Sequence, residues 1–173
     1  MKKLIVTLSL VLFANVFYGQ TVFDKFDNQD DISAFVVNKK MFDLMSKVEV
    51  KDKESKQYME LISKLDNLKV FVTQNAKKAT EMRNTADKFV KTSGLEELMR
   101  VTDKGKNVRI YVKSGAGDTQ IKELLMFVEG ASNNETVLMS LTGNFDLDEL
   151  SVLTDKMKLP GGDDLKKASK SKK

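Results

Sequence analysis

Four consecutive segments between residues 98 and 143 constrain the fold more than any other part of the chain. Each alternates apolar and polar residues or is apolar throughout, and turn-forming residues separate each segment from the next. The segments are 98–102, 107–113, 121–129 and 136–143. Because connections of hairpin length force neighbouring strands to run antiparallel, the sequence predicts a four-stranded antiparallel meander.

The segments that connect the strands of this meander contain turn-forming residues. Residues 103–106 (DKGK) form a hairpin loop, and 114–118 (SGAGD) form a flexible one. We reject a phosphate-binding loop at 114–118, since no Gly-Lys-Ser/Thr follows and a strand, not a helix, comes next. Segment 121–129 has apolar residues on both faces, which predicts an inner strand covered on both sides. Segment 98–102 also fits a helix, but we favour a strand.

Three acidic residues follow the last strand. Asp146 and Glu149 have the spacing of a helix capping box, and Phe145 could pack onto Leu150 as a hydrophobic staple. A helix is therefore expected to begin here and to reach about Met157. We interpret the acidic residues as a cap and not as a metal or acid/base site.

The earlier half of the chain predicts three helices and one strand. Apolar positions at helical spacing predict helices over 30–48, 55–65 and 76–92, with a turn at Asp66-Asn67 and a strand over 68–73. The whole is an α+β fold: a largely antiparallel sheet of about five strands with helices packed on one face. Strand 68–73 reaches the next strand through a helix, so it could lie parallel to a neighbour.

Composition excludes several chemistries. The chain has no Cys, His or Trp, so it lacks Cys nucleophiles, Ser-His-Asp triads, zinc sites built on His or Cys, and disulfides. Without the first nineteen and last sixteen residues, 21 basic residues stand against 23 acidic ones. A near-neutral domain offers no basic face for nucleic acid. We expect no catalytic residue, no metal and no cofactor.

The two ends of the chain have their own patterns. Residues 1–19 have a basic start, an apolar run and small residues, which predicts an export signal that is too short to span a membrane. We expect a single domain over 20–157 and a disordered tail over 158–173. The tail is lysine-rich and is our one candidate surface-binding segment; the lysines concerned are Lys166, Lys167, Lys170, Lys172 and Lys173.

Several long stretches resemble one family. They are LMRVTDKGKNVRIYVKSGAGDTQIKELLMFVEG, TVLMSLTGNFDLDELSVL, ISAFVVNKKMFDLM and KLDNLKVFVT. They are similar to an uncharacterised family of small secreted proteins from Gram-negative bacteria, the domain of unknown function family 4252. The resemblance covers nearly all of the chain after the leader. It implies an exported envelope protein and supplies no catalytic residue.

These observations favour a non-catalytic periplasmic or envelope domain that binds a protein or a lipid surface, with no membrane span after the leader. Two alternatives stay open. One is a regulatory partner in envelope stress signalling, which rests on the resemblance alone. The other is an enzyme using carboxylates or a Ser-Lys pair, for which no recognisable spacing exists. A cavity with two carboxyls of raised pKa would favour the enzyme, and an exposed apolar surface would favour binding.

Overall fold

One six-stranded sheet carries the fold. The computed structural model describes residues 22–117, 119–130, 134–150 and 163–164. After a short 3-10 turn at Asp24–Phe26, the elements in chain order are β1 (Ser33–Asn38), α2 (Lys39–Ser46), α3 (Lys53–Ser63), β2 (Leu65–Thr73), α4 (Ala76–Ser93), β3 (Glu96–Asp103), β4 (Lys106–Ser114), β5 (Gln120–Glu129) and β6 (Thr136–Asp146), followed by a 3-10 turn at Leu147–Glu149.

The sheet is antiparallel throughout, in the order β1-β2-β6-β5-β4-β3. Strands β3 to β6 form the predicted meander, and the segment 98–102 lies in a strand. The β3–β4 turn is tight: Asp103 pairs with Lys106, and the two residues between them have φ of 45° and 88°. These angles suit the hairpin turn that matches the twist of the strands, and Gly105 tolerates the second of them.

Two sequence predictions about β2 are wrong. The strand is antiparallel to both neighbours, β1 and β6, and not parallel to either. Asp66 and Asn67 do not turn the chain but lie within β2, where a bulge between Leu65 and Asn67 absorbs the irregularity. Helix α4 leads from β2 at one side of the sheet to β3 at the opposite edge, so the strands joined by the helix are not neighbours.

The first predicted helix is also corrected. The segment 30–48 contains a strand, β1, and then a shorter helix, α2. Phe35, Val36 and Val37 are residue types that favour strands, and Asn38 ends the strand and caps the helix through its side chain. The added strand raises the count from about five to six.

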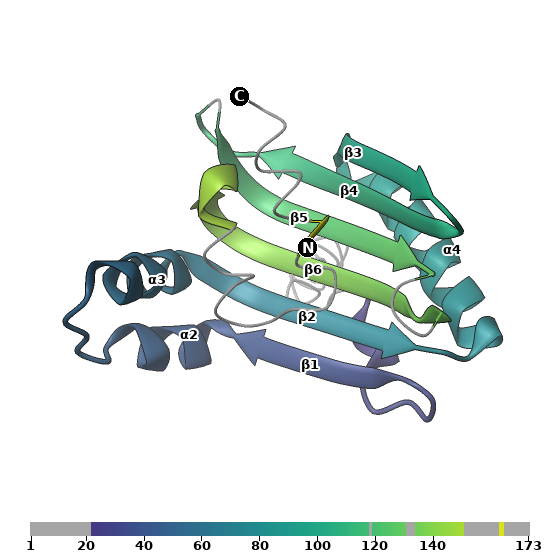
Figure 1. Ribbon diagram of the computed structural model, residues 1–173, viewed down its shortest axis with the longest axis horizontal. Coiled ribbons are helices and arrows are strands. Elements are labelled where there is room, and N and C mark those ends of the chain that lie inside the picture. Colours follow the sequence, from purple (N-terminus) through teal and green to yellow (C-terminus); the bar gives the residue numbers. More distant parts are fainter. Residues whose placement is uncertain (1–21, 118, 131–133, 151–162, 165–173) are drawn as a thin grey trace, which may run out of the picture.

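Helices cover both faces of the sheet, which corrects the prediction of one covered face (Figure 1). On the face of Met126, the cluster includes Phe42 from α2 and Leu61 from α3. On the face of Leu125, it includes Met82 from α4. Leu125 and Met126 therefore point to opposite sides of β5 and are both fully buried, as the sequence predicted.

Other local predictions are confirmed. The helix predicted over 76–92 is α4, which begins after the cap Asn75 and ends at Ser93, followed by Gly94, whose φ of 68° suits glycine. The backbone N–H of Asp146 donates to the Glu149 carboxylate at 2.9 Å, which is half of the predicted capping box. The start of the predicted last helix is a 3-10 turn, and its continuation from residue 151 lies outside the described residues.

The predicted leader over 1–19 also lies outside the described residues, as does most of the predicted tail. Asp163 and Asp164 are the described part of the tail. Asp164 is buried, and its carboxylate accepts a hydrogen bond from Lys106 Nζ at 2.8 Å. The chain at this point therefore contacts the beginning of β4.

Candidate binding surface

The exposed apolar side chains gather in one region. Among the described residues, six large hydrophobic side chains are exposed, and five of them belong to β1, α2 or the residues just after α2. We call these five the edge surface: Phe35 at 48% exposure, Val36 at 44%, Met41 at 50%, Leu44 at 56% and Val48 at 57%. An exposed apolar patch of this kind marks an interaction site more often than scattered single residues do.

Strand β1 lies at one edge of the sheet. It pairs with β2 along one side, and its outer side faces no other described strand (Figure 1). Val37 is buried opposite Leu68, which anchors the strand to the core. Phe35 and Val36 point to opposite faces, yet about half of each side chain is exposed. An edge strand with open backbone groups and apolar side chains is a template for another strand.

Helix α2 extends the apolar surface. Its inner side places Phe42 in the core, where it is fully buried, and Met45 packs against the same cluster. Met41 and Leu44, three residues apart on α2, are exposed beside this inner side, and Val48 is exposed just after the helix ends. The hydrophobic residues of this segment therefore form two stripes, one in the core and one exposed.

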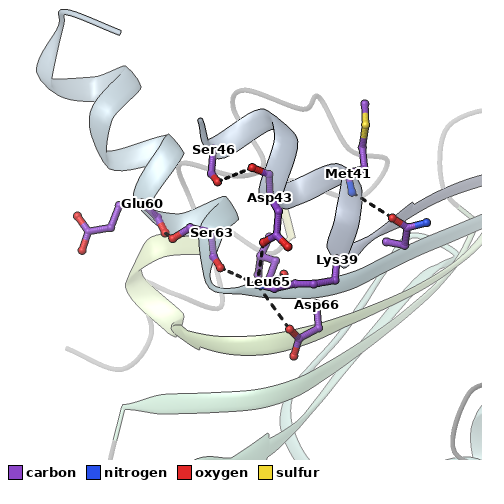
Figure 2. Close-up of polar contacts among 9 residues, drawn as sticks. Lys39, Met41, Asp43, Ser46, Glu60, Ser63, Leu65 and Asp66 are labelled. Atoms are coloured by element: carbon purple, nitrogen blue, oxygen red, sulfur yellow. Dashed lines mark hydrogen bonds and ion pairs between the residues drawn. The ribbon is translucent and has the colours of Figure 1, made fainter. Parts of the chain in front are cut away.

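Polar contacts around Lys39 hold α2 in place. Lys39 Nζ donates to the carbonyl oxygens of Ser63 at 2.8 Å and Leu65 at 3.3 Å. It also forms ion pairs with Asp43 at 3.4 Å and Asp66 at 3.8 Å. Figure 2 shows these groups around the Lys39 side chain, with Met41 pointing away from them. These contacts connect the start of α2 to the end of α3 and the start of β2, and so fix the helix that carries Met41 and Leu44.

Charged residues flank β1 on both ends. Asp30 and Asp31 precede the strand, and Lys39 and Lys40 follow it. Asp31 accepts a hydrogen bond from the Asn75 side chain at 3.0 Å, and Lys39 has the contacts just given. Asp30 and Lys40 are exposed and form no ion pair with another described residue. The strand itself carries no charged residue.

A lysine-lined cleft lies beside Lys39, with a volume of about 510 Å³. Lys64 and Lys122 also line it, together with Gly143 and Asn144. Lys64 forms ion pairs with Glu149 at 2.7 Å and Glu60 at 3.6 Å, and the hydrogen bond to Glu149 raises its pKa. Two of its three lysines therefore already have carboxylate partners and tie α2, α3 and β2 together.

No described group has the geometry of a catalytic pair. Glu123 is the one described carboxyl with a raised pKa; burial raises it, and nearby Lys113 lowers it in part. The part of the chain that the structure describes contains no cluster of acidic residues that could hold a metal ion. Asp146 and Glu149, which we interpreted from the sequence as a helix cap, form a capping contact: the Asp146 backbone N–H donates to the Glu149 carboxylate.

Two further cavities, of about 370 and 520 Å³, lie at the start of α4 and along its outer side.

The sequence-predicted binding residues in the tail, Lys166, Lys167, Lys170, Lys172 and Lys173, lie outside the described residues. Sequence reasoning missed the edge surface because it placed 30–48 in one helix with a single broad apolar face. The signal that could have found it is the run Phe35-Val36-Val37, which favours a strand, directly before the capping residue Asn38.

No helix within the described ranges is long and apolar enough to cross a membrane.

The fold and surface together define a class: an α+β domain built on one antiparallel sheet, with one apolar edge left open. The chain belongs to the family described as domain of unknown function (DUF4252), which it matches over residues 25–153. That match covers all six strands and the helices α2, α3 and α4. No curated protein and no solved structure is significantly similar to the chain.

Proposed function

We propose that the protein is a non-catalytic domain of the cell envelope that binds another protein chain through the edge surface. The observation that carries this proposal is the concentration of exposed apolar side chains on β1 and α2. Burying a large apolar side chain stabilises an interface by roughly 1.5–3 kcal/mol. A set of five on one edge supplies the apolar anchors that protein interfaces use.

The arrangement of the polar groups favours a binding role over a catalytic one. An enzyme of this composition would need a pair of carboxylates or a Ser-Lys pair within reach of a common cavity. Glu123 lies on strand β5 opposite Lys113, and burial raises its pKa while this lysine lowers it in part. Two of the three lysines beside the cleft at α2, Lys39 and Lys64, already bind carboxylates or carbonyl oxygens. The edge surface is the better candidate for a functional site.

The location in the envelope rests on the leader pattern over residues 1–19. Mass spectrometry of the native protein tests it. The proposal expects a chain that begins near Gln20. A cytoplasmic protein that retains Met1 would contradict export.

Photo-crosslinking in cells tests the binding surface. A photoreactive amino acid at Leu44, on the exposed side of α2, should give crosslinked protein adducts. The matched control is the same amino acid at Thr102, which is exposed on β3 at the opposite edge. Adducts several-fold stronger at Leu44 support the proposal. Equal adducts at the two positions, or none at Leu44, would overturn it.

A further inference from the structure

Three exposed lysines surround the apolar side chains at the α2 end of the edge surface. Lys40 lies on α2 one turn before Leu44, and Lys47, the residue that caps the end of α2, lies one turn after Leu44. Lys51 is exposed in the connector that leads to α3, three residues after the exposed Val48. We call Lys40, Lys47 and Lys51 the lysine rim.

The charges of the lysine rim are not used within the described part of the chain. None of the three ammonium groups forms an ion pair or a hydrogen bond with another described residue. The two lysines on the inner side of this region behave differently, since Lys39 and Lys64 bind carboxylates. The rim is therefore available to a partner, and the inner lysines are not.

The acidic residues beside the rim do not cancel its charge. Asp43 forms an ion pair with Lys39 at 3.4 Å, and Asp52 accepts a hydrogen bond from the Ser55 backbone N–H at 2.8 Å. Glu49 is exposed in the connector and forms no ion pair with another described residue. Three ammonium groups therefore stand against one carboxylate around the exposed apolar side chains.

The acidic residues at the other end of β1 are too distant to change this balance. Asp27 and Asp30 are exposed before the strand begins. A strand of six residues is about 20 Å long at about 3.3 Å per residue. That length exceeds twice the Debye length, which is about 8 Å at physiological ionic strength. The α2 end of the edge surface therefore has a positive field of its own.

We propose that the α2 end of the edge surface binds a protein segment in which acidic residues flank apolar side chains. This inference rests on the proposed function, since it gives the chemistry of the partner. Apolar side chains of the segment pack against Met41, Leu44 and Val48, and its carboxylates pair with the lysine rim. An apolar centre with a charged rim is the usual anatomy of a protein interface. Complementary charge at such a rim speeds association and excludes partners of the wrong sign.

The position of α2 suits such a partner. Helices α2 and α3 lie past the ends of β1 and β2, so a segment can reach α2 without displacing a strand (Figure 1). The contacts of Lys39 fix the start of α2, and Met41 points away from them (Figure 2). The surface is therefore already formed before binding, which lowers the entropy cost of association.

Reversal of the rim charges tests the inference through the photoreactive amino acid at position 44. The triple variant Lys40→Glu, Lys47→Glu and Lys51→Glu should lower the yield of protein adducts about tenfold, because three attractive pairs become repulsive.

A matched control reverses three lysines on α4 that are also exposed and form no ion pair with another described residue. These are Lys77→Glu, Lys88→Glu and Lys91→Glu. This variant has the same net charge as the rim variant and should keep the adducts of the parent protein. An equal loss in both triple variants, or no loss in the rim variant, overturns the inference.

Two further variants separate charge from folding. Replacing the three rim lysines with arginine keeps the charge and should keep the adducts. Replacing them with glutamine removes the charge without adding repulsion, and the adduct yield should fall between those of the parent protein and the reversed variant. All the variants should melt with the parent protein, since the side chains are exposed. Adducts that are lost with arginine, or retained in full with glutamine, contradict recognition by charge.

The outcomes separate this inference from the proposed function. If Leu44 gives protein adducts that rim reversal does not weaken, the proposed function stands and the acidic partner is wrong. If Leu44 gives no protein adduct, both are wrong. Sedimentation with phosphatidylglycerol vesicles identifies a lipid surface in that case: rim reversal, and not the α4 control, would then reduce binding to the vesicles.

Discussion

The two edges of the sheet differ in how they are protected. Strand β3, at one edge, carries four charged residues among eight, a bulge between Glu97 and Met99, and an ion pair between Arg100 and Glu97. Strand β1, at the other edge, has neither a charged residue nor a bulge in its pairing with β2. Charges and bulges are the features by which natural sheets prevent unwanted strand pairing.

This difference indicates that the chain protects the β3 edge of its sheet from strand pairing and leaves the β1 edge accessible. A chain that protects one edge and leaves the other apolar has an asymmetry that folding does not require, since both edge strands pair in the same manner with one neighbour. The exposed stripe of α2 lies next to the unprotected edge and not the protected one (Figure 1). The predictions below test this contrast, beginning with the interior that both edges share.

The largest effect is expected at the centre of the sheet. Met126→Asp should unfold the domain, because Met126 is fully buried and an unpaired buried charge costs several kcal/mol. Phe35→Asp, at the half-exposed edge, should leave the domain folded. Thermal unfolding followed by circular dichroism compares the two variants. An unchanged melting temperature for Met126→Asp would mean that β5 does not lie in the centre.

A smaller loss is expected beside the protected edge. Gly130 has φ of 69°, and a Cβ there would lie 2.4 Å from the carbonyl oxygen of Gly105 in the β3–β4 turn. Gly130→Ala should therefore destabilise the domain by about 1–3 kcal/mol, the range for a strained backbone position. Chemical denaturation measures the change. The control is Gly117→Ala, where the nearest heavy atom to a Cβ is at 3.8 Å and no strain is expected.

Removing the protection of β3 should create a second associating edge. The double variant Glu97→Val with Arg100→Val gives β3 the apolar character of β1. An edge strand without charges pairs more readily with other strands, so the double variant should form larger species than the parent protein does. Light scattering after size-exclusion chromatography detects them. A size distribution equal to that of the parent protein would show that the charges of β3 do not protect this edge.

The smallest effect concerns the stability of the interior and not the assembly. Burial raises the pKa of Glu123, so the folded chain holds this proton to a higher pH than the unfolded chain does. Stability is then lost as the pH rises from the ordinary carboxyl range through the raised pKa, and the loss persists above it. Glu123→Gln should remove this loss, so the variant gains stability relative to the parent at neutral pH and not below pH ~4.

Denaturation at several pH values measures the difference between the two chains. A constant difference across the acidic range would contradict the assignment.

The meander and α4 were predictable because their signals are local. Alternation in the segments after residue 98 and the turn residues between them specify both strand and neighbour. Asn75 and Gly94 specify the ends of α4 through capping alone. These features need no knowledge of distant residues, and the structure has them where the sequence predicted them.

The open edge was not predictable in the same way. The apolar residues of 30–48 satisfy a helical period, and β1 becomes a strand by pairing with β2, whose partner residues lie 29 to 39 positions further along the chain. The second helical layer was missed for a related reason. Residues Leu124 to Val128 are apolar on both faces, which requires two covers, but the sequence does not indicate which helix supplies each.

The most direct test of the central claim uses the absence of cysteine from the chain. A single introduced cysteine, Leu44→Cys on the exposed side of α2 or Thr102→Cys on β3, can carry a thiol-reactive crosslinker. The account predicts protein adducts at position 44 that are several-fold stronger than those at position 102. Equal adducts at the two positions, or none at position 44, would contradict it.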